Sequence, residues 1–284
     1  MAVADVAAGG ALRAGPMLKR VASAAVLLPA FVWAVAGAPA WVFPLVVVAA
    51  AARAAWELGR MLERAGRPVH RRLGVLAGTA VTASFAVPLP DDAALGGAMT
   101  ALAVMLVLSA PLFTREAPAT ERTAHTLLGV MYVNWLLGYA IVLHALPAGA
   151  ALVLFLVGVT WTGETAAYLV GSTVGRRRLA PVISPGKTVE GAVAQVAVSV
   201  VAAGVLGAWL LPGCGGTWAL TAGALLGVVG QVGDLVESVL KRSVSLKDTG
   251  ALIPGHGGVL DRIDSLLFNA PLLYFLAAHV GCGA

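Results

Sequence analysis

The chain has 284 residues, of which 59% are hydrophobic and 12% are charged, and its mean hydropathy is +0.89. Soluble domains are about 45 to 50% apolar and about 25% charged. This composition excludes a soluble globular protein, and the long apolar runs without a heptad exclude a disordered chain and a coiled coil. The predicted fold class is an all-α polytopic integral membrane protein.

Apolar runs of about 17 to 25 residues span a bilayer as helices, and the sequence contains about nine of them. In chain order they are Val21 to Gly37, Ala40 to Leu58, Leu73 to Leu89, Ala93 to Phe113, Thr126 to Leu146, Ala150 to Val170, Ala192 to Leu211, Thr217 to Val236 and Ile263 to Val280. Four spans form an N-terminal membrane region (1–125). Five form a C-terminal membrane region (126–284), with polar loops 171–191 and 237–262.

The basic residues indicate the orientation, because Lys and Arg accumulate in cytoplasmic loops. With a cytoplasmic N-terminus, every one of the 19 basic residues lies inside, or, for Arg53, within reach of the inner boundary. An odd span count then puts the C-terminus outside. We interpret the net charge of +5 as a topology signal and expect no nucleic-acid partner.

The two cysteines, Cys214 and Cys282, both fall on the predicted outer face. An oxidising compartment would permit a disulfide there. We expect two unpaired thiols in short loops, with the disulfide as the alternative.

Carboxylates occur in pairs at two predicted helix ends. Asp234 and Glu237 are three residues apart at the end of the eighth span, and Asp261 and Asp264 repeat this spacing at the start of the ninth. Side chains three apart share a helix face, and an oxygen donor set suits Mg²⁺ or Mn²⁺. We expect Asp234, Asp261 and Asp264 to bind one or two Mg²⁺ ions, with Glu237 as a further ligand. The alternatives are that Glu237 pairs with Lys241 and that the two later aspartates only favour a helix N-terminus.

Basic residues and glycines accompany these acids in the second loop. Glycine allows backbone angles that point N–H groups at an anion, and the helix that follows adds its own N-terminal donors. The loop is therefore predicted to bind phosphate through Lys241, Arg242, Lys247, His256, Gly257 and Gly258. For His256, an ordinary hydrogen-bonded loop histidine is the alternative.

The first loop has a similar character. Ser184, Lys187 and Thr188 surround a glycine just before the predicted helix from Ala192. Hydroxyls, a lysine and free helix N–H groups are phosphate-binding groups. We expect this loop to bind phosphate as well.

These residues resemble the signature of the phosphatidate cytidylyltransferase family, also called CDP-diacylglycerol synthases. The signature is carried by SVLKR at 238–242, KD at 247–248, PGHGG at 254–258 and DRIDS at 261–265. GDLVES at 233–238 and ISPGKTVEG at 183–191 are similar to two further elements of the family. The resemblance runs from Trp161 to Ser265, with weaker matches at Lys19 to Val21, Pro29 and Trp56 to Glu57.

One position departs from the family pattern. Where the family has aspartate in a D-[ST]-[GA]-A-Y element, this chain has Glu164, followed by TAAY. Glutamate keeps the charge but moves it outward by one methylene. If this carboxylate contacts metal or nucleotide, activity or metal preference should shift.

The resemblance implies a nucleotidyltransferase of phospholipid synthesis that condenses CTP with phosphatidate to give CDP-diacylglycerol and pyrophosphate. The lipid phosphate attacks the α-phosphorus of CTP in line. Both reacting groups are polyanions, so metal ions and basic side chains are expected to bring them together. The resemblance also implies a substrate contact by Arg262, a homodimer, and a multi-pass protein of the inner cell membrane with its active site on the cytoplasmic face.

Three other functions fit parts of the pattern. A CTP-dependent lipid kinase would transfer the γ-phosphoryl group and release CDP. A transporter would carry acids near the midplane of the membrane, whereas these lie at one face. An inactive scaffold descended from the enzyme is the third alternative, because of Glu164.

Overall fold

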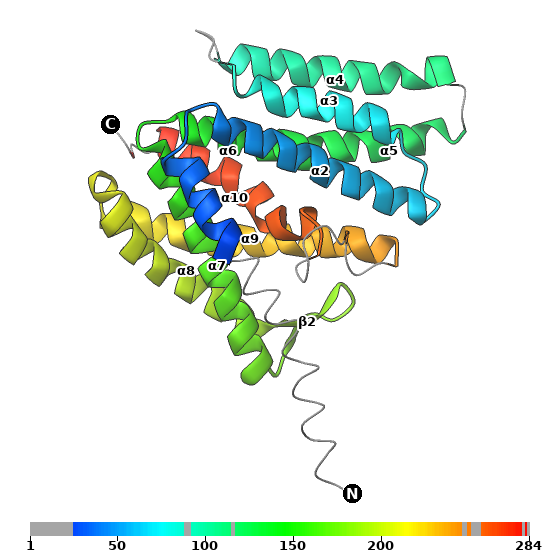
Figure 1. The fold of residues 1–284 in the computed structure, drawn as a ribbon. Coiled ribbons are helices and arrows are strands. Elements are labelled where there is room, and N and C mark those ends of the chain that lie inside the picture. Colours follow the sequence, from blue (N-terminus) through cyan, green and yellow to red (C-terminus); the bar gives the residue numbers. More distant parts are fainter. Residues whose placement is uncertain are drawn as a thin grey trace, which may run out of the picture.

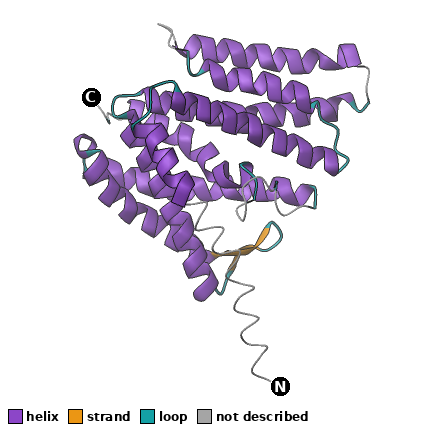
Figure 2. Ribbon diagram, viewed as in Figure 1, coloured by secondary structure: helices purple, strands orange, loops and turns teal. Residues whose placement is uncertain are grey.

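The structure is a computed structural model that describes residues 25–87, 92–114, 117–245, 249–250, 257–279 and 282, with side chains described from residue 96 in the second range. Figures 1 and 2 show that these residues are almost entirely helical. The predicted all-α membrane class is confirmed, and a small hairpin is added to it.

The elements follow one another along the chain, and the longest connection, residues 244–259, joins α9 to α10. They are a first helix Ala25–Ala36, α2 (Val42–Arg64), α3 (Arg71–Ser84), α4 (Asp92–Thr114), α5 (Ala119–Gly129), the π-helical turn η1 (Val130–Trp135), α6 (Leu136–Ala145), α7 (Gly149–Thr173), β1 (Arg178–Ala180), β2 (Ser184–Thr188), α8 (Val189–Leu210), the 3-10 turn η2 (Pro212–Cys214), α9 (Gly216–Ser243) and α10 (Leu260–His279). The strands form one antiparallel pair, with Arg178 opposite Thr188.

Each of the nine predicted spans overlaps a helix among the described residues. Six helices of the described chain are long and apolar enough to cross a bilayer: Val42–Arg64, Gly96–Thr114, Ala119–Ala145, Gly149–Thr173, Val189–Leu210 and Gly216–Ser243. The other three predicted spans correspond to Ala25–Ala36, α3 and α10. The first two are short, and α10 begins with three charged residues within five positions.

The helices form two groups that meet along α6 and α10. In Figure 1, α3 and α4 lie side by side at the top with α2 and α5 beneath them, and α7, α8 and α9 lie below. α10 packs against α6 on one side and α9 on the other. The N-terminal helices therefore rest on the helix whose first turn carries Asp261 and Asp264.

Small residues bring α8 and α9 together. A Cβ atom on Gly223 would lie 2.7 Å from the Ser199 carbonyl oxygen, and one on Gly227 would lie 2.9 Å from the Val196 Cα atom. Glycines at four-residue spacing allow such close helix contacts in membranes. The close contact holds α8, and with it the hairpin at its N-terminus, against α9.

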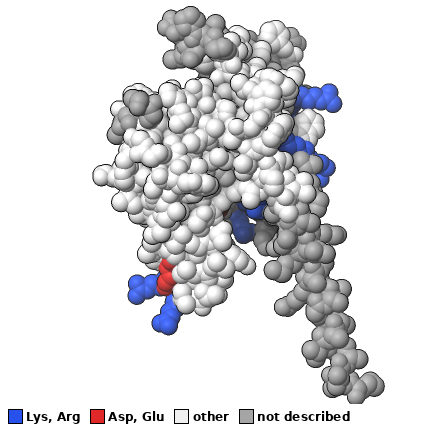
Figure 3. All heavy atoms as spheres, turned by 60° about the vertical axis from the view of Figure 1, so that its left-hand side comes forward, with Lys and Arg blue, Asp and Glu red and all other residues white. Residues whose placement is uncertain are grey.

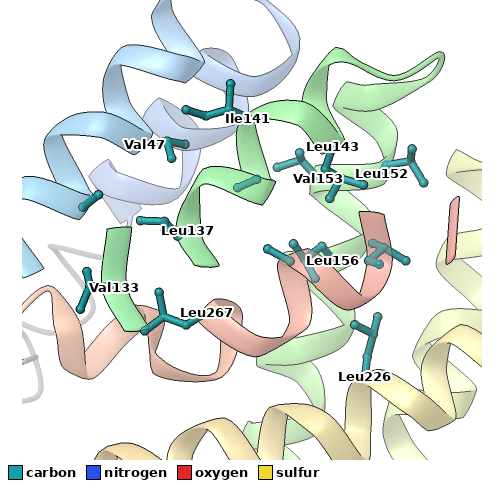
Figure 4. Packing of buried hydrophobic residues seen from close by; sticks show 14 of the residues in the cluster. Val47, Val133, Leu137, Ile141, Leu143, Leu152, Val153, Leu156, Leu226 and Leu267 are labelled. Atoms are coloured by element: carbon teal, nitrogen blue, oxygen red, sulfur yellow. The ribbon is translucent and has the colours of Figure 1, made fainter. Parts of the chain in front are cut away.

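The apolar residues divide between a buried core and an exposed belt. Figure 4 shows the core cluster between the two groups, with Val133 and Leu137 from η1 and α6, Leu156 from α7 and Leu267 from α10. Figure 3 shows a face with few charged side chains, which are visible at its lower and right-hand margins and in a recess at its lower centre. Large apolar side chains such as Phe113 are exposed, as expected for a surface that contacts lipid.

The cysteines correct one expectation. Cys214, in η2, and Cys282 form a disulfide, so the prediction of two unpaired thiols was wrong. Their separation of 68 residues gives no pairing signal, and only the packing of α10 against α9 brings them together. The disulfide joins the α8–α9 connection to the chain just beyond α10.

Candidate active site

Three carboxylates meet where α9 packs against α10. Asp234 and Glu237, three residues apart on α9, lie beside Asp264 of α10, and one oxygen atom of each lies within 4.8 Å of the others. Gly233 permits this approach, since a Cβ atom there would lie 2.9 Å from the Asp264 carbonyl oxygen. The three residues are called the acidic triad below.

The donor atoms of the acidic triad fit a divalent cation. Glu237 is 1% exposed; its Oε2 atom pairs with Lys241 Nζ at 2.5 Å, but no residue in the described ranges donates a hydrogen bond to its Oε1 atom. Asp264 is 9% exposed, and its Oδ1 atom accepts the N–H of Ser265 at 2.8 Å. Carboxylates so close repel one another unless a proton or a cation lies between them, and an all-oxygen set suits Mg²⁺. Glu237 thus takes both expected positions, beside Lys241 and beside the aspartates.

Asp261 is used differently from the triad. Its Oδ2 atom accepts the N–H of Gly258 at 2.8 Å and the hydroxyl of Thr249 at 3.0 Å, and its Oδ1 atom lies 3.1 Å from Lys241 Nζ. Burial raises the pKa of the Asp261 carboxyl, but the Gly258 N–H and the Lys241 ammonium outweigh it and hold the pKa below its ordinary value. The ionised Asp261 therefore fixes the segment before α10, and Lys241 connects it to Glu237.

The two residues before α10 that approach carboxylates must be glycines, because a Cβ atom at either position would clash with a carboxylate oxygen. Gly257 has a φ angle of +86°, and a Cβ atom there would lie 2.9 Å from Asp261 Oδ2. A Cβ atom on Gly258 would lie 2.6 Å from Glu57 Oε2. The anion at the Gly258 N–H is thus a carboxylate of the chain itself, whereas the sequence suggested a substrate phosphate.

A buried glutamate of the N-terminal region also reaches this segment. Glu57 of α2 is 2% exposed, and its Oε2 atom accepts the N–H of Leu260 at 3.0 Å. Its Oε1 atom pairs with Arg53 at 3.1 Å. The sequence marked Glu57 only as a weak family match, and the structure shows why the residue matters: it binds the first turn of α10.

A cavity of about 300 Å³ adjoins the triad between α7, the hairpin, α8 and α9. Its polar lining consists of Glu164, Tyr168, Ser172, Ser184, Lys187, Thr188, Gln195, Gln231 and Asp234. Lys187 Nζ lies 2.8 Å from Asp234 Oδ2. Asp234 therefore belongs to the triad and to the cavity wall, and it joins the carboxylates to the predicted phosphate-binding loop.

The hairpin places the residues of the first loop. Thr188 caps α8, because its hydroxyl accepts the N–H of Gly191 at 3.1 Å. Arg242 of α9 donates from Nε to the Ile183 carbonyl oxygen at 3.1 Å, which ties the hairpin to α9. Ser184 thereby lines the cavity on the hairpin side.

Glu164, the departure from the family pattern, lies in the cavity wall. It projects from α7, and Ser265, Asp234, Arg262 and Lys187 lie close enough to influence its carboxylate. The exposed Arg262 is thus near the cavity. The position of Glu164 makes its extra methylene relevant to whatever the cavity binds.

Some predicted residues cannot be placed, and others were missed. Lys247 and His256 lie outside the described residues. Sequence reasoning missed Thr249, which holds Asp261, and Tyr132, whose hydroxyl is buried. A single threonine in a polar loop and a single tyrosine in an apolar span carry no signal of their own.

The fold and the site define a class: multi-pass membrane proteins with a charged site built at the ends of packed helices. Within that class, the chain belongs to the Cytidylyltransferase family, whose model matches residues 18–280.

Curated relatives agree with this membership. The chain is 37% identical over 177 residues to a phosphatidate cytidylyltransferase of Bacillus subtilis, covering 62% of this chain and 66% of the relative. It is 46% identical over 132 residues to a phosphatidate cytidylyltransferase of Synechocystis, covering 45% and 44%. It is 43% identical over 154 residues to the uncharacterized protein YnbB of Escherichia coli, covering 54% and 51%. The chain thus spans 44% to 66% of the length of these relatives.

Proposed function

We propose that this protein is a phosphatidate cytidylyltransferase, which condenses CTP with phosphatidate to give CDP-diacylglycerol and pyrophosphate. Two of the relatives carry that name. The observation that carries the proposal is the position of Asp234, which is shared between a carboxylate triad and a cavity that contains Lys187. A reaction between two polyanions needs this combination of metal ligands and cationic phosphate contacts.

Asp234, Glu237 and Asp264 would hold Mg²⁺, which Mn²⁺ could replace. When bound, the ion would offset the negative charge of the reacting phosphates. Asp261, which the sequence placed with the ligands, would instead keep Lys241 and the first turn of α10 in position, because its oxygen atoms are occupied by donors of the chain.

The cationic side chains would bring the two phosphates together. When substrate binds, the Lys187 ammonium would leave its ion pair with Asp234 and bind a substrate phosphate. Ser184 and Thr188 lie in the same cavity wall and would contact that phosphate too. Further contacts would come from Arg242, Lys247, His256, Arg262 and Gly257, whereas the N–H of Gly258 is taken by Asp261. Glu164 in the cavity wall is the remaining candidate contact for metal or nucleotide.

The reaction needs no proton transfer by the protein. A phosphate monoester has a second pKa of about 6, so the lipid phosphate is largely dianionic at neutral pH. It is itself the nucleophile. One of its oxygen atoms forms a bond to the α-phosphorus of CTP. The bond from that phosphorus to the bridging oxygen breaks in line, and pyrophosphate leaves.

The test uses purified protein in detergent with Mg²⁺, phosphatidate and CTP labelled at the α-phosphate in one sample and at the γ-phosphate in another. We expect α-label in the lipid product and γ-label in pyrophosphate, with Asp264→Asn as the inactive control. Lipid that carries the γ-label, together with released CDP, would show a lipid kinase instead. Absence of both products from wild type would contradict the proposal.

We further propose nine spans in the inner membrane, with the site on the cytoplasmic face and the Cys214–Cys282 disulfide outside. The disulfide supports this orientation, because such bonds persist in oxidising compartments, and it joins the ends of α8 and α10 that lie away from the site. Cysteine introduced at Thr217 in intact cells should react with a membrane-impermeant thiol reagent, whereas cysteine introduced at Arg178 should react only after lysis. The reverse pattern would contradict the orientation.

A homodimer, implied by the family resemblance, completes the proposal. Light scattering of the detergent-solubilised protein, corrected for bound detergent, should give twice the chain mass of 28.7 kDa. The chain mass itself would contradict the dimer without affecting the proposed reaction.

A further inference from the structure

The hydroxyl of Tyr132 is buried, and none of the described residues forms a hydrogen bond with it. Tyr132 lies in the π-helical turn η1, a type of turn found frequently at functional sites. The residue is 6% exposed, and its hydroxyl has no hydrogen-bond partner in the described part of the chain. Buried polar groups are nearly always paired, because an unpaired one is unfavourable. The hydroxyl therefore calls for a partner other than the residues that the structure describes.

The side chain of Tyr132 packs against the helix that carries Asp264. Its ring meets the ring of Phe268 nearly edge-on, with the ring centroids 6.4 Å apart. Phe268 lies four residues after Asp264, so the two occupy one face of α10, and a Cβ atom on Gly233 would lie 3.3 Å from Phe268 Cδ2. The carboxylates of Glu237, Asp264 and Asp234 lie close enough to the phenol to act on it electrostatically.

The opposite side of the same turn is anchored. The Asn134 side chain donates to Thr82 Oγ1 at 3.2 Å, and the Thr82 hydroxyl donates to the Asn134 carbonyl oxygen at 2.9 Å. Residues two apart in a helix do not share a face. With Asn134 held against α3, Tyr132 is therefore held toward α10, and its direction is determined by the packing of η1.

We infer that Tyr132 is a positioning residue of the acidic triad, whose phenolic O–H donates a hydrogen bond to an oxygen atom bound to the cation there. That oxygen belongs to a water molecule or to a phosphate of the nucleotide. The inference rests on the proposed function for the cation, but nothing in the family comparison assigns a role to Tyr132. This arrangement explains three observations among the described residues. The Tyr132 hydroxyl has an acceptor, the π-helical turn has a function, and the Oε1 atom of Glu237 has the cation as its partner.

Removing the hydroxyl should weaken cation binding without loosening the fold. Loss of a group that orients metal ligands typically costs about 10-fold to 100-fold in metal affinity or activity. For Tyr132→Phe we expect about a 10-fold rise in the Kd for Mn²⁺. The melting temperature of the cation-free protein should stay the same or rise, because the hydroxyl has no partner within the described chain to lose.

The experiment measures free Mn²⁺ by electron paramagnetic resonance during titration of the purified full chain, once with Mn²⁺ alone and once with CTP present. Tyr139→Phe is the matched control, since it removes a hydroxyl from the same helical segment, at a residue packed against Trp135 and Tyr274. A weaker affinity of Tyr132→Phe for Mn²⁺ alone identifies the acceptor as a water ligand. A weaker affinity only with CTP identifies a phosphate oxygen.

Two results would overturn the inference while leaving the cation site intact. One is Mn²⁺ binding by Tyr132→Phe within twofold of wild type in both titrations, when Asp264→Asn has lost binding. The other is a lower melting temperature of the cation-free Tyr132→Phe protein, which would show that the hydroxyl has a structural partner. If wild type fails to bind Mn²⁺, or Asp264→Asn binds it equally well, the cation site of the proposed function falls, and the inference falls with it.

Discussion

The carboxylate of Glu57 accepts the backbone N–H of Leu260 at 3.0 Å, across 203 positions of sequence. Glu57 belongs to α2, and Leu260 is the first residue of α10. A free N–H group at a helix start needs an acceptor, and here a distant helix supplies it. The N-terminal membrane region thus takes part in the site by fixing the turn from which Asp261 and Asp264 project.

The first prediction concerns this contact. Glu57→Gln should lower the free energy of unfolding by about 1 to 3 kcal/mol, because a buried N–H and Arg53 lose an ionised partner. Turnover should fall in parallel, since the start of α10 loses its fixed position. Thermal unfolding in detergent and CDP-lipid formation measure the two effects.

Glu63→Gln is the matched control on the same helix. Glu63 pairs with Arg71 at 3.0 Å, but its side chain is 41% exposed, and exposed pairs contribute at most about 1 kcal/mol. Identical unfolding temperatures for Glu57→Gln, Glu63→Gln and wild type would remove Glu57 from the site.

Local patterns in the sequence predicted much of this molecule. Apolar runs indicated helices, because a chain in lipid must satisfy its own backbone groups. The three-residue spacing of Asp234 and Glu237 placed both side chains toward α10, because that spacing follows from helix geometry alone.

Contacts between distant segments could not be predicted. Asp261 and Asp264 have the spacing of a pair, yet Asp261 is held by Thr249 and Gly258 while Asp264 joins the triad. The partners that separate their roles come from the loop and from α9. The Cys214–Cys282 disulfide and the direction of Tyr132 likewise depend on how α9, α10 and η1 pack.

The second prediction separates Asp264 from Asp261. Asp264→Asn should lower turnover about 10²-fold to 10³-fold, because it removes charge where the transition state needs a cation. Higher Mg²⁺ should restore part of that activity. Asp261→Asn should also lose activity, but without rescue by Mg²⁺ and with a lower melting temperature, since it loosens Thr249, Gly258 and Lys241.

The comparison can fail in either direction. Rescue of Asp261→Asn by Mg²⁺ would return this residue to the metal ligands, and activity of Asp264→Asn within threefold of wild type would remove Asp264 from them. The double variant Asp234→Asn with Asp264→Asn should lose much less than the product of the two single losses, because ligands of one ion act as a unit.

The third prediction concerns the cavity. Lys187→Ala should raise the KM for substrate with no rescue by Mg²⁺, because it removes a cationic phosphate contact and leaves the triad in place. Arg178→Ala is the control, since Arg178 is an exposed residue of the same hairpin and does not line the cavity. Equal KM values for the two variants would indicate that Lys187 makes no direct phosphate contact and that the loop attracts substrate only by its overall positive charge.

The fourth prediction concerns Glu164, which lies in the cavity wall near Asp234 and Ser265. If its carboxylate contacts metal or nucleotide, Glu164→Gln should lower turnover about 10-fold or more, because the amide keeps the shape and loses the charge. Glu164→Asp keeps the charge and restores the residue of the family pattern, so its turnover should equal or exceed that of wild type. Initial rates at saturating CTP, measured separately with Mg²⁺ and Mn²⁺, compare the three proteins and show whether the added methylene changes the metal preference. Equal rates for wild type and Glu164→Gln with both metals would mean that the charge at this position has no part in the reaction, and Glu164 would then only line the cavity.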